Sequence, residues 1–129
     1  MSEDVSTAVG SQVLFENDFV RVWEMVLAPG EEFPVHKHLH DHVLIYPEPG
    51  KIRGHIVGVD QVAVQEVDAG WVFFRAVGPD GIPPHWVENI GDESSRHFII
   101  ELLAPSVADA PRDPEHNGRG VFDYPDEDA

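Results

Sequence analysis

Short stretches rich in β-branched and aromatic residues recur along most of this chain, and glycine, proline, asparagine or aspartate separates them. Residues 19–28 are a clear example, because Pro29-Gly30 follows them directly. Such residues favour strands and such breaks favour turns, whereas no stretch shows a convincing period of 3.6 residues. The pattern predicts an all-β sandwich or barrel. The expected strands are 12–16, 19–28, 33–38, 42–46, 51–59, 62–67, 71–77, 85–89 and 96–103.

The length of 129 residues and a hydrophobic content of 42% fit one globular domain with one core. We expect that domain to span residues 12–104. Residues 1–11 are small and polar, and we expect a flexible N-terminus there. Residues 105–129 contain four prolines, many acidic residues and few apolar ones. This composition predicts an extended acidic, proline-rich tail.

Composition excludes several classes of partner and site. The chain has no cysteine, which rules out disulfides and thiolate metal ligands. The net charge of −16 argues against nucleic acids and anionic membranes, because both bind basic surfaces. No run of about 18 apolar residues is present, and the N-terminus lacks a basic region followed by an apolar one. We therefore expect a cytoplasmic protein that binds neither nucleic acids nor membranes.

Histidines are concentrated in one short segment. Four of the seven residues from position 36 to position 42 are histidine, and His85 lies about forty residues further on. Imidazole is the commonest protein ligand for metals. In a strand, His36 and His38 point to the same face. One strand would place His36 and His42 about 20 Å apart, which is too far to share one ion. The chain must therefore turn at residues 39–41, and we expect it to return along a neighbouring strand.

The arrangement of these histidines resembles the first motif of the cupin superfamily. That motif is a glycine, five residues, His-x-His, three or four residues, a glutamate, six residues and a glycine. Here Gly30 precedes His36 and His38 at the family's spacing, and three further residues lead to His42. His42 stands where the family usually has glutamate. Gly50 lies one residue later than the motif places its last glycine.

A second segment resembles the second cupin motif, which contains Pro-x-Gly, two residues, His, three residues and Asn. Pro79-Asp-Gly81 is followed by three residues, then His85, then three more residues and Asn89. The spacing to the histidine is one residue longer than usual, and Gly70 is three residues too early for the leading glycine. Both motifs occur in order in a strand-rich chain, and the resemblance covers about residues 12–104.

The resemblance implies a double-stranded β-helix, the jelly-roll barrel of cupins, with a metal inside. It implies ligation by His36, His38, His42 and His85, a four-histidine centre of a kind that some cupins have. One divalent transition metal is expected among Fe, Mn, Ni, Cu and Zn, with Fe or Mn favoured. We place His40 in a solvent-facing turn, and Asp41 is an alternative fifth ligand.

The favoured function by this resemblance is a dioxygenase that acts on a small carbonyl, enol or carboxylate-bearing substrate. The alternatives are an isomerase or lyase and a non-catalytic binding module. Cupin-like proteins are commonly homodimers, and a homodimer would cover exposed sheet edges.

Other residues are weaker candidates for the site. The possible catalytic groups are Glu101, His55 and Tyr46, and the possible pocket residues are Trp86, Phe73, Tyr46 and His55. Glu101 lies among apolar residues on the last strand, where burial would require a partner, and we favour a position on the outer face. We expect His97 to be exposed to solvent.

Overall fold

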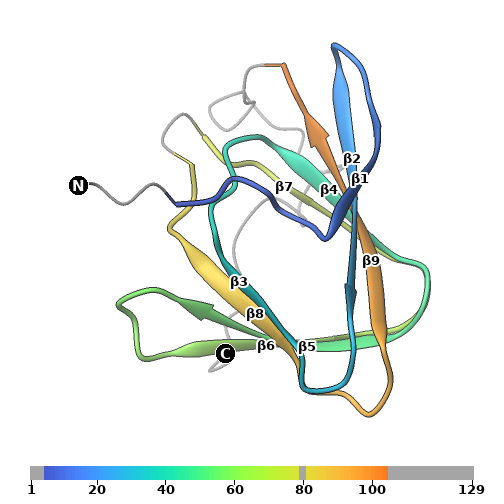
Figure 1. Ribbon diagram of the computed structural model, residues 1–129, viewed down its shortest axis with the longest axis vertical. Helices are drawn as coiled ribbons and strands as arrows, with labels where there is room; N and C mark the ends of the chain where they lie inside the picture. The colour runs from blue at the N-terminus through green and yellow to red at the C-terminus, as the bar shows by residue number, and fades with distance from the viewer. Residues whose placement is uncertain (1–4, 79–80, 105–129) are drawn as a thin grey trace, which may run out of the picture.

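The structure is a computed structural model that describes residues 5–78 and 81–104. Within these residues, nine strands form two antiparallel sheets, shown in Figure 1, and the predicted all-β class is confirmed. One sheet has the strand order β1-β2-β9-β4-β7 and the other the order β3-β8-β5-β6. Within the described residues there is no helix long and apolar enough to cross a membrane. The strands are β1 (Gln12–Glu16), β2 (Val20–Leu27), β3 (Glu32–His36), β4 (His42–Tyr46), β5 (Gly50–Ile56), β6 (Val62–Val67), β7 (Trp71–Arg75), β8 (His85–Asn89) and β9 (Ser95–Leu102).

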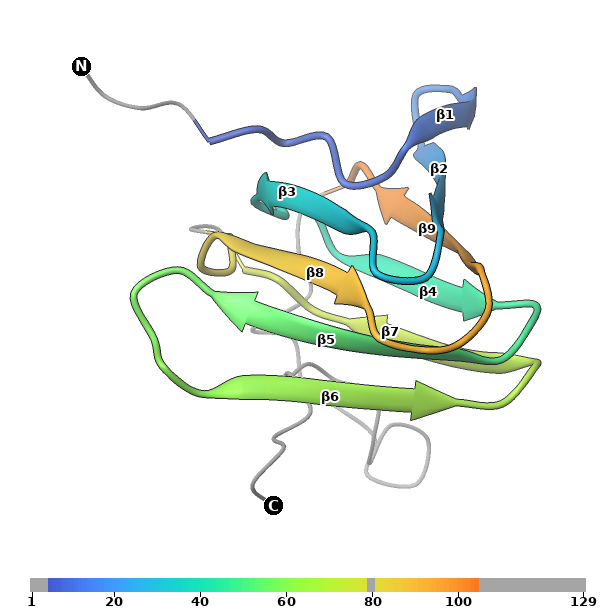
Figure 2. The same ribbon diagram turned by 60° about the horizontal axis from the view of Figure 1, so that its bottom comes forward.

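The two sheets lie one in front of the other, with the core between them (Figure 2). Strand β9 shows how the sequence builds this interior, because buried and half-buried residues alternate along its whole length. Ile99 therefore faces the core, and so do His97 and Glu101 on the same side of the strand. The apolar centre of the core consists of Val9, Met25, Leu27, Leu44, Ile52 and Ile99.

The turn between the histidines lies where the sequence predicts it, but it connects different strands. Strand β3 ends at His36 and pairs with β8, whereas β4 begins at His42 and pairs with β7 and β9. The expected return along a neighbouring strand is wrong, since residues 37–41 cross from one sheet to the other. A crossing keeps both ends of the segment directed into the same interior, because the inner faces of the two sheets oppose each other.

The described part of the N-terminal segment lies against the barrel. Ser6 forms an isolated parallel bridge with His36, and the Lys37 amide donates a hydrogen bond to the Ser6 carbonyl at 2.8 Å. Val9 has no exposed surface and belongs to the core. The segment expected to be flexible, residues 1–11, thus includes residues that fill the interior. The predicted tail at 105–129 and the motif residues Pro79 and Asp80 lie outside the described residues.

Candidate metal centre

Three histidines meet at one end of the barrel interior. His36 and His85 are partners across the β3–β8 pair, and their ring centroids lie 4.3 Å apart. The His38 ring lies 5.2 Å from each of the other two, centroid to centroid. One potential ligand atom from each residue lies within 4.8 Å of the others, and all three side chains are buried. Ligand nitrogens about 2.0–2.1 Å from an ion are at most about 4.2 Å apart, so a small contraction would let these rings share one ion.

His42 reaches the same place from the opposite sheet. Its ring stacks on His38 with centroids 4.2 Å apart and 20° between the planes. His42 is fully buried, and its Nε2 has no hydrogen-bond partner among the described residues. It is not part of the group of three whose ligand atoms lie within 4.8 Å of one another. The structure therefore brings three of the four predicted ligands together and stacks the fourth on one of them.

Main-chain carbonyls orient three of these rings by the same local contact. In each of these three histidines, Nδ1 lies within hydrogen-bond distance of the carbonyl oxygen of the residue two positions earlier in the chain. A carbonyl only accepts, so Nδ1 carries the proton and the neutral ring keeps its lone pair on Nε2. Contacts of this type fix the ring orientation of metal-binding histidines. The pairs are His36 with Pro34 (2.9 Å), His42 with His40 (2.8 Å) and His85 with Pro83 (3.1 Å).

The interior keeps these imidazoles neutral. Burial is the main cause that lowers the pKa of His42 and of His85 to about 3, and the positive charge of Arg75 contributes to both shifts. Burial also lowers the pKa of His36, and it lowers the pKa of His38 well below its usual value. A neutral imidazole is the form that binds a metal. All four rings are therefore in the ligating form at neutral pH.

Glycine at position 81 is required by the position of His38. Gly81 has φ of 78°, and a Cβ added to it would lie 2.8 Å from the His38 carbonyl oxygen. The next residue, Ile82, donates its amide to the same carbonyl at 3.3 Å. The segment before β8 thus supports the segment after β3. This contact gives a physical reason for a glycine before His85.

We expect Gly81→Ala to weaken metal retention and to lower the free energy of unfolding by about 1–3 kcal/mol, the range for a strained left-handed residue. Gly58→Ala is the matched control, because Gly58 has φ of 85° and nothing within 4 Å of an added Cβ. Gly58→Ala should therefore lower the free energy of unfolding only through the strain of a positive φ at alanine, without a clash. Denaturant unfolding and metal analysis of both variants test this. Equal behaviour of the two variants would show that the contact with His38 is unimportant.

A cavity of about 50 Å³ lies beside the histidine group. Tyr46 lines it, is buried and stacks on His97 with ring centroids 4.4 Å apart. The prediction that His97 is exposed is wrong. Burial lowers its pKa to about 3, and its Nδ1 has no hydrogen-bond partner among the described residues. The lining residues are Val9, Met25, His36, His38, Leu44, Tyr46, Ile52, Gln65, Arg75, His85, Val87, His97 and Ile99.

His55 and Trp86, both expected in the substrate pocket, lie elsewhere. Their rings stack on each other at 3.8 Å, and His55 Nε2 lies 2.8 Å from a carboxylate oxygen of Glu88. Neither residue lines the cavity. The reason is strand alternation: His85 and Val87 point inward from β8, so Trp86 between them points to the outer face. Proximity to His85 in sequence thus places Trp86 on the opposite side of the sheet.

Two further candidates are structural in their contacts. Phe73 packs against the core and stacks on Trp71, with ring centroids 5.3 Å apart, but does not line the cavity. Glu101 is buried and does not line it either. Its Oε1 accepts hydrogen bonds from Trp23 Nε1 at 2.7 Å and from Arg21 Nη1 at 3.3 Å. The favoured outer-face position of Glu101 is therefore wrong, because its carboxylate is buried and has its partners on β2.

The two expected turn residues, His40 and Asp41, differ in burial. His40 is half-buried, and its carbonyl serves as the acceptor for His42. Asp41 is buried, and its Oδ1 accepts the Val77 amide at 2.7 Å. Asp41 is not in the group of possible metal ligands found in the described part of the chain.

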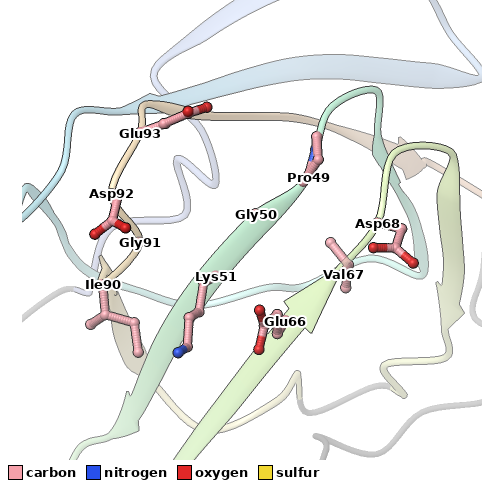
Figure 3. Close-up of a pocket in the computed structure, with 10 residues that line it drawn as sticks. All are labelled: Pro49, Gly50, Lys51, Glu66, Val67, Asp68, Ile90, Gly91, Asp92 and Glu93. Atoms are coloured by element: carbon pink, nitrogen blue, oxygen red, sulfur yellow. The ribbon is translucent and has the colours of Figure 1, made fainter.

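Figure 3 shows a larger groove, of about 380 Å³, on the surface. No histidine is among its described lining residues. Lys51 and Glu66 are partners on β5 and β6, and both border it. Asp68, Asp92 and Glu93 complete an acidic rim. The group of possible metal ligands found in the described residues, His36, His38 and His85, does not border this groove. We therefore place the candidate site at the smaller interior cavity.

No protein-family model and no curated protein matches this chain. Solved structures do match. A cupin domain from Bordetella pertussis is 24% identical, with 80% of this chain and 100% of that one covered and a TM-score of 0.62. A Klebsiella pneumoniae protein with a double-stranded β-helix domain is 22% identical, with coverages of 70% and 73% and a TM-score of 0.52. The polyketide cyclase RemF from Streptomyces resistomycificus is 18% identical, with coverages of 78% and 74% and a TM-score of 0.50. Together with the two antiparallel sheets, these likenesses show that the chain has the double-stranded β-helix fold of the cupins.

Proposed function

We propose that this protein is a metal-dependent enzyme acting on a small carbonyl, enol or carboxylate-bearing substrate, with the metal held by His36, His38, His42 and His85. The observation that carries the proposal is the buried group of histidines beside an interior cavity. The buried Nε2 of His42, without a hydrogen-bond partner among the described residues, supports the fourth ligand. A buried polar atom of this kind is costly unless something binds it.

The donor set indicates the class of metal. Four neutral imidazoles suit first-row ions, and we favour Fe or Mn. Such an ion supplies Lewis acidity and, for Fe or Mn, a change of oxidation state. Histidine in place of the glutamate leaves the full +2 charge of a divalent ion in the site, which favours anionic or enolisable substrates.

The protein's own residues provide the rest of the site. Met25, Leu44, Ile52, Val87 and Ile99 line the cavity with apolar side chains, which keep bulk water away from a bound substrate. Main-chain carbonyls orient three of the four proposed ligand rings, those of His36, His42 and His85. Among the non-ligating residues, Tyr46, Gln65, Arg75 and His97 offer polar groups to a substrate in the cavity.

We favour dioxygenase chemistry as the reaction. A specific observation supports isomerase or lyase chemistry as the second candidate. His97 lines the cavity, is neutral and has an Nδ1 without a hydrogen-bond partner among the described residues. A buried neutral imidazole can accept a proton from a substrate carbon and return it elsewhere. A non-catalytic binding module remains the alternative outside enzymes.

Metal content tests the proposed centre. We expect near-stoichiometric Fe or Mn by inductively coupled plasma mass spectrometry of untagged wild-type protein. His42→Ala and His85→Ala should each lose at least tenfold in metal affinity. His40→Ala is the matched control from the same segment, and it should keep its metal because the backbone carbonyl at position 40 remains. Absence of tight metal in the wild type, even after reconstitution with each candidate ion, would refute the proposal.

Oxygen consumption separates the candidate reactions. Metal-loaded protein should take up O₂ with one of a panel of small diketones, phenols and thiols if it is a dioxygenase. Turnover that proceeds equally well without O₂ would instead identify an isomerase or lyase. Metal binding without turnover of any panel member, in either atmosphere, would favour a binding module.

A further inference from the structure

The outer face of the five-stranded sheet is apolar, although it is turned away from the core. Along β9 one side of the strand is buried in the interior, so the residues on its other side point outward. Strand register extends this outer face across the whole sheet. An antiparallel sheet with one solvated face commonly carries polar side chains on that face. Here the apolar residues of the outer face are Phe15, Val20, Val22, Val26, Val43, Ile45, Val72, Phe74, Phe98, Ile100 and Leu102.

One row of these side chains crosses all five strands. Ile100 on β9 is the register partner of Val22 on β2 and of Val43 on β4. The row continues to both edges of the sheet, through Phe15 on β1 and Phe74 on β7. Directly opposed residues have Cβ atoms about 4.5–5.5 Å apart, close enough for their side chains to pack side by side. The apolar surface is therefore continuous from one edge of the sheet to the other.

Among the described strands, no third layer covers this face, because all nine belong to the two facing sheets (Figure 2). Phe15 is 55% exposed, Val72 is 58% exposed and Val26 is 43% exposed. Strand spacing and strand length give the face a projected area of roughly 400–600 Å². Contiguous apolar patches of this size on a protein surface are often interaction sites.

The polar residues of the outer face are few and bind one another. Glu24 accepts hydrogen bonds from Gln12 Nε2 at 2.8 Å and from Arg96 Nε at 2.7 Å. The Arg96 guanidinium also lies over the Phe98 ring, with Cζ 4.7 Å from the ring centroid. The charges of Glu24 and Arg96 cancel, whereas the whole chain has a net charge of −16. Two copies of so acidic a chain repel each other least where two neutral faces meet.

We propose that this outer face is the interface of a homodimer in which the five-stranded sheets of two copies pack face to face. A second copy offers a sheet of the same size and the same apolar character, and a two-fold axis brings the identical patches together. Side chains of two such faces can interdigitate between sheets about 10 Å apart. The accessible surface of the side chains exceeds the projected area, which brings each partner's share close to the roughly 800 Å² of a standard interface.

Other occupants fit this face less well. A basic partner would be attracted to the acidic remainder of the surface rather than to a neutral face. Residues 105–129 contain few apolar side chains with which to cover it. In this proposal the homodimer expected from the sequence is joined through a sheet face instead of sheet edges. The interface is independent of the metal centre, because the histidines lie on the inner side of the sheets.

Sedimentation velocity of the full chain, over a series of protein concentrations and salt levels, tests the proposal. We expect the wild type to sediment with twice the chain mass of 14.4 kDa. Val43→Glu introduces a carboxylate into the apolar row and should raise the dissociation constant of the dimer at least tenfold. Salt should tighten the wild-type dimer, because it screens the repulsion between two acidic chains.

Val64→Glu is the matched control, since it makes the same substitution on the outer face of the other sheet. Val64 is half-buried on β6, opposite Arg53, and the next residue, Gln65, lines the interior cavity. This variant should dimerise as the wild type does. If Val43→Glu fails to fold, Val72→Glu places the carboxylate on a mostly exposed side chain of the same face, and it should also weaken the dimer. Circular dichroism verifies the fold of each variant.

Three results would overturn the proposal. The first is a monomeric wild type at every concentration. The second is wild-type dimer affinity in the folded Val43→Glu and Val72→Glu variants. The third is a dimer that dissociates as salt is added, because such a contact would be electrostatic rather than apolar. Metal content of the same samples tests the proposed function separately, and either proposal can fail without the other.

Discussion

Glu101→Ala is expected to lower the free energy of unfolding by about 2–4 kcal/mol, because it removes the acceptor of two buried or half-buried donors. Trp23 Nε1 would lose its 2.7 Å hydrogen bond, and Arg21 would lose one of its two carboxylate partners. Arg21 can still pair with Glu16, which limits the cost of its lost contact. Urea unfolding of the metal-free protein measures the change.

Glu101→Gln is the matched variant for this prediction. It keeps a carbonyl oxygen for Trp23 and removes only the charge, so we expect a loss of about 1 kcal/mol. Metal content should stay at the wild-type level in both variants, because Glu101 does not line the cavity. Loss of metal in Glu101→Gln would show that this carboxylate serves the site directly, contrary to its observed contacts.

Metal-free protein is expected to lose stability steeply as the pH falls below about 6.5. His42, His85 and His97 each have a folded-state pKa of about 3, whereas an unfolded histidine titrates near 6.5. Between these values the unfolded chain binds more protons than the native protein, so acid favours unfolding. Each such histidine contributes a loss of up to about 1.4 kcal/mol per pH unit. The stabilisation is complete above pH 6.5 and is lost progressively towards pH 3.

Urea unfolding at a series of pH values from 7.5 to 4.5 checks this dependence. The net charge of −16 works in the opposite direction, because protonating carboxylates reduces repulsion between them. Moderate salt screens that repulsion and isolates the histidine effect. His97→Gln removes one of the titrating rings and should flatten the slope by about 1.4 kcal/mol per pH unit. A stability that is flat or rising from pH 6.5 to 5 would contradict the prediction.

The fold class and the principal histidines were predictable because both depend on local signals. Turn residues between short apolar stretches mark the strands, and the two-residue spacing of His36 and His38 predicts that their side chains share one side of the chain. The position of the turn at residues 39–41 followed from the reach of a strand. The sequence did not predict which sheet the chain enters after that turn. Nothing in the local sequence distinguishes a return along a neighbouring strand from a crossing to the facing sheet.

His97 and Arg75 were harder to interpret. In β9 both faces of the strand carry apolar residues, so the alternation does not show which face is inside. An exposed His97 was therefore as consistent with the pattern as a buried one. Arg75 did leave a signal, since it is an isolated charge in an otherwise apolar strand. Strand alternation applied to Trp86 would also have placed that ring opposite His85.

The carbonyls that orient His36, His42 and His85 belong to the main chain, which has a consequence for how such a site changes over evolutionary time. Point mutations at residues 34, 40 and 83 alter side chains but leave a carbonyl at each position. Related chains can therefore diverge widely around the ligands without losing control over which ring nitrogen is available. The orienting contacts are inherited with the path of the backbone, and sequence identity between such proteins can fall far before the arrangement of the three rings is lost.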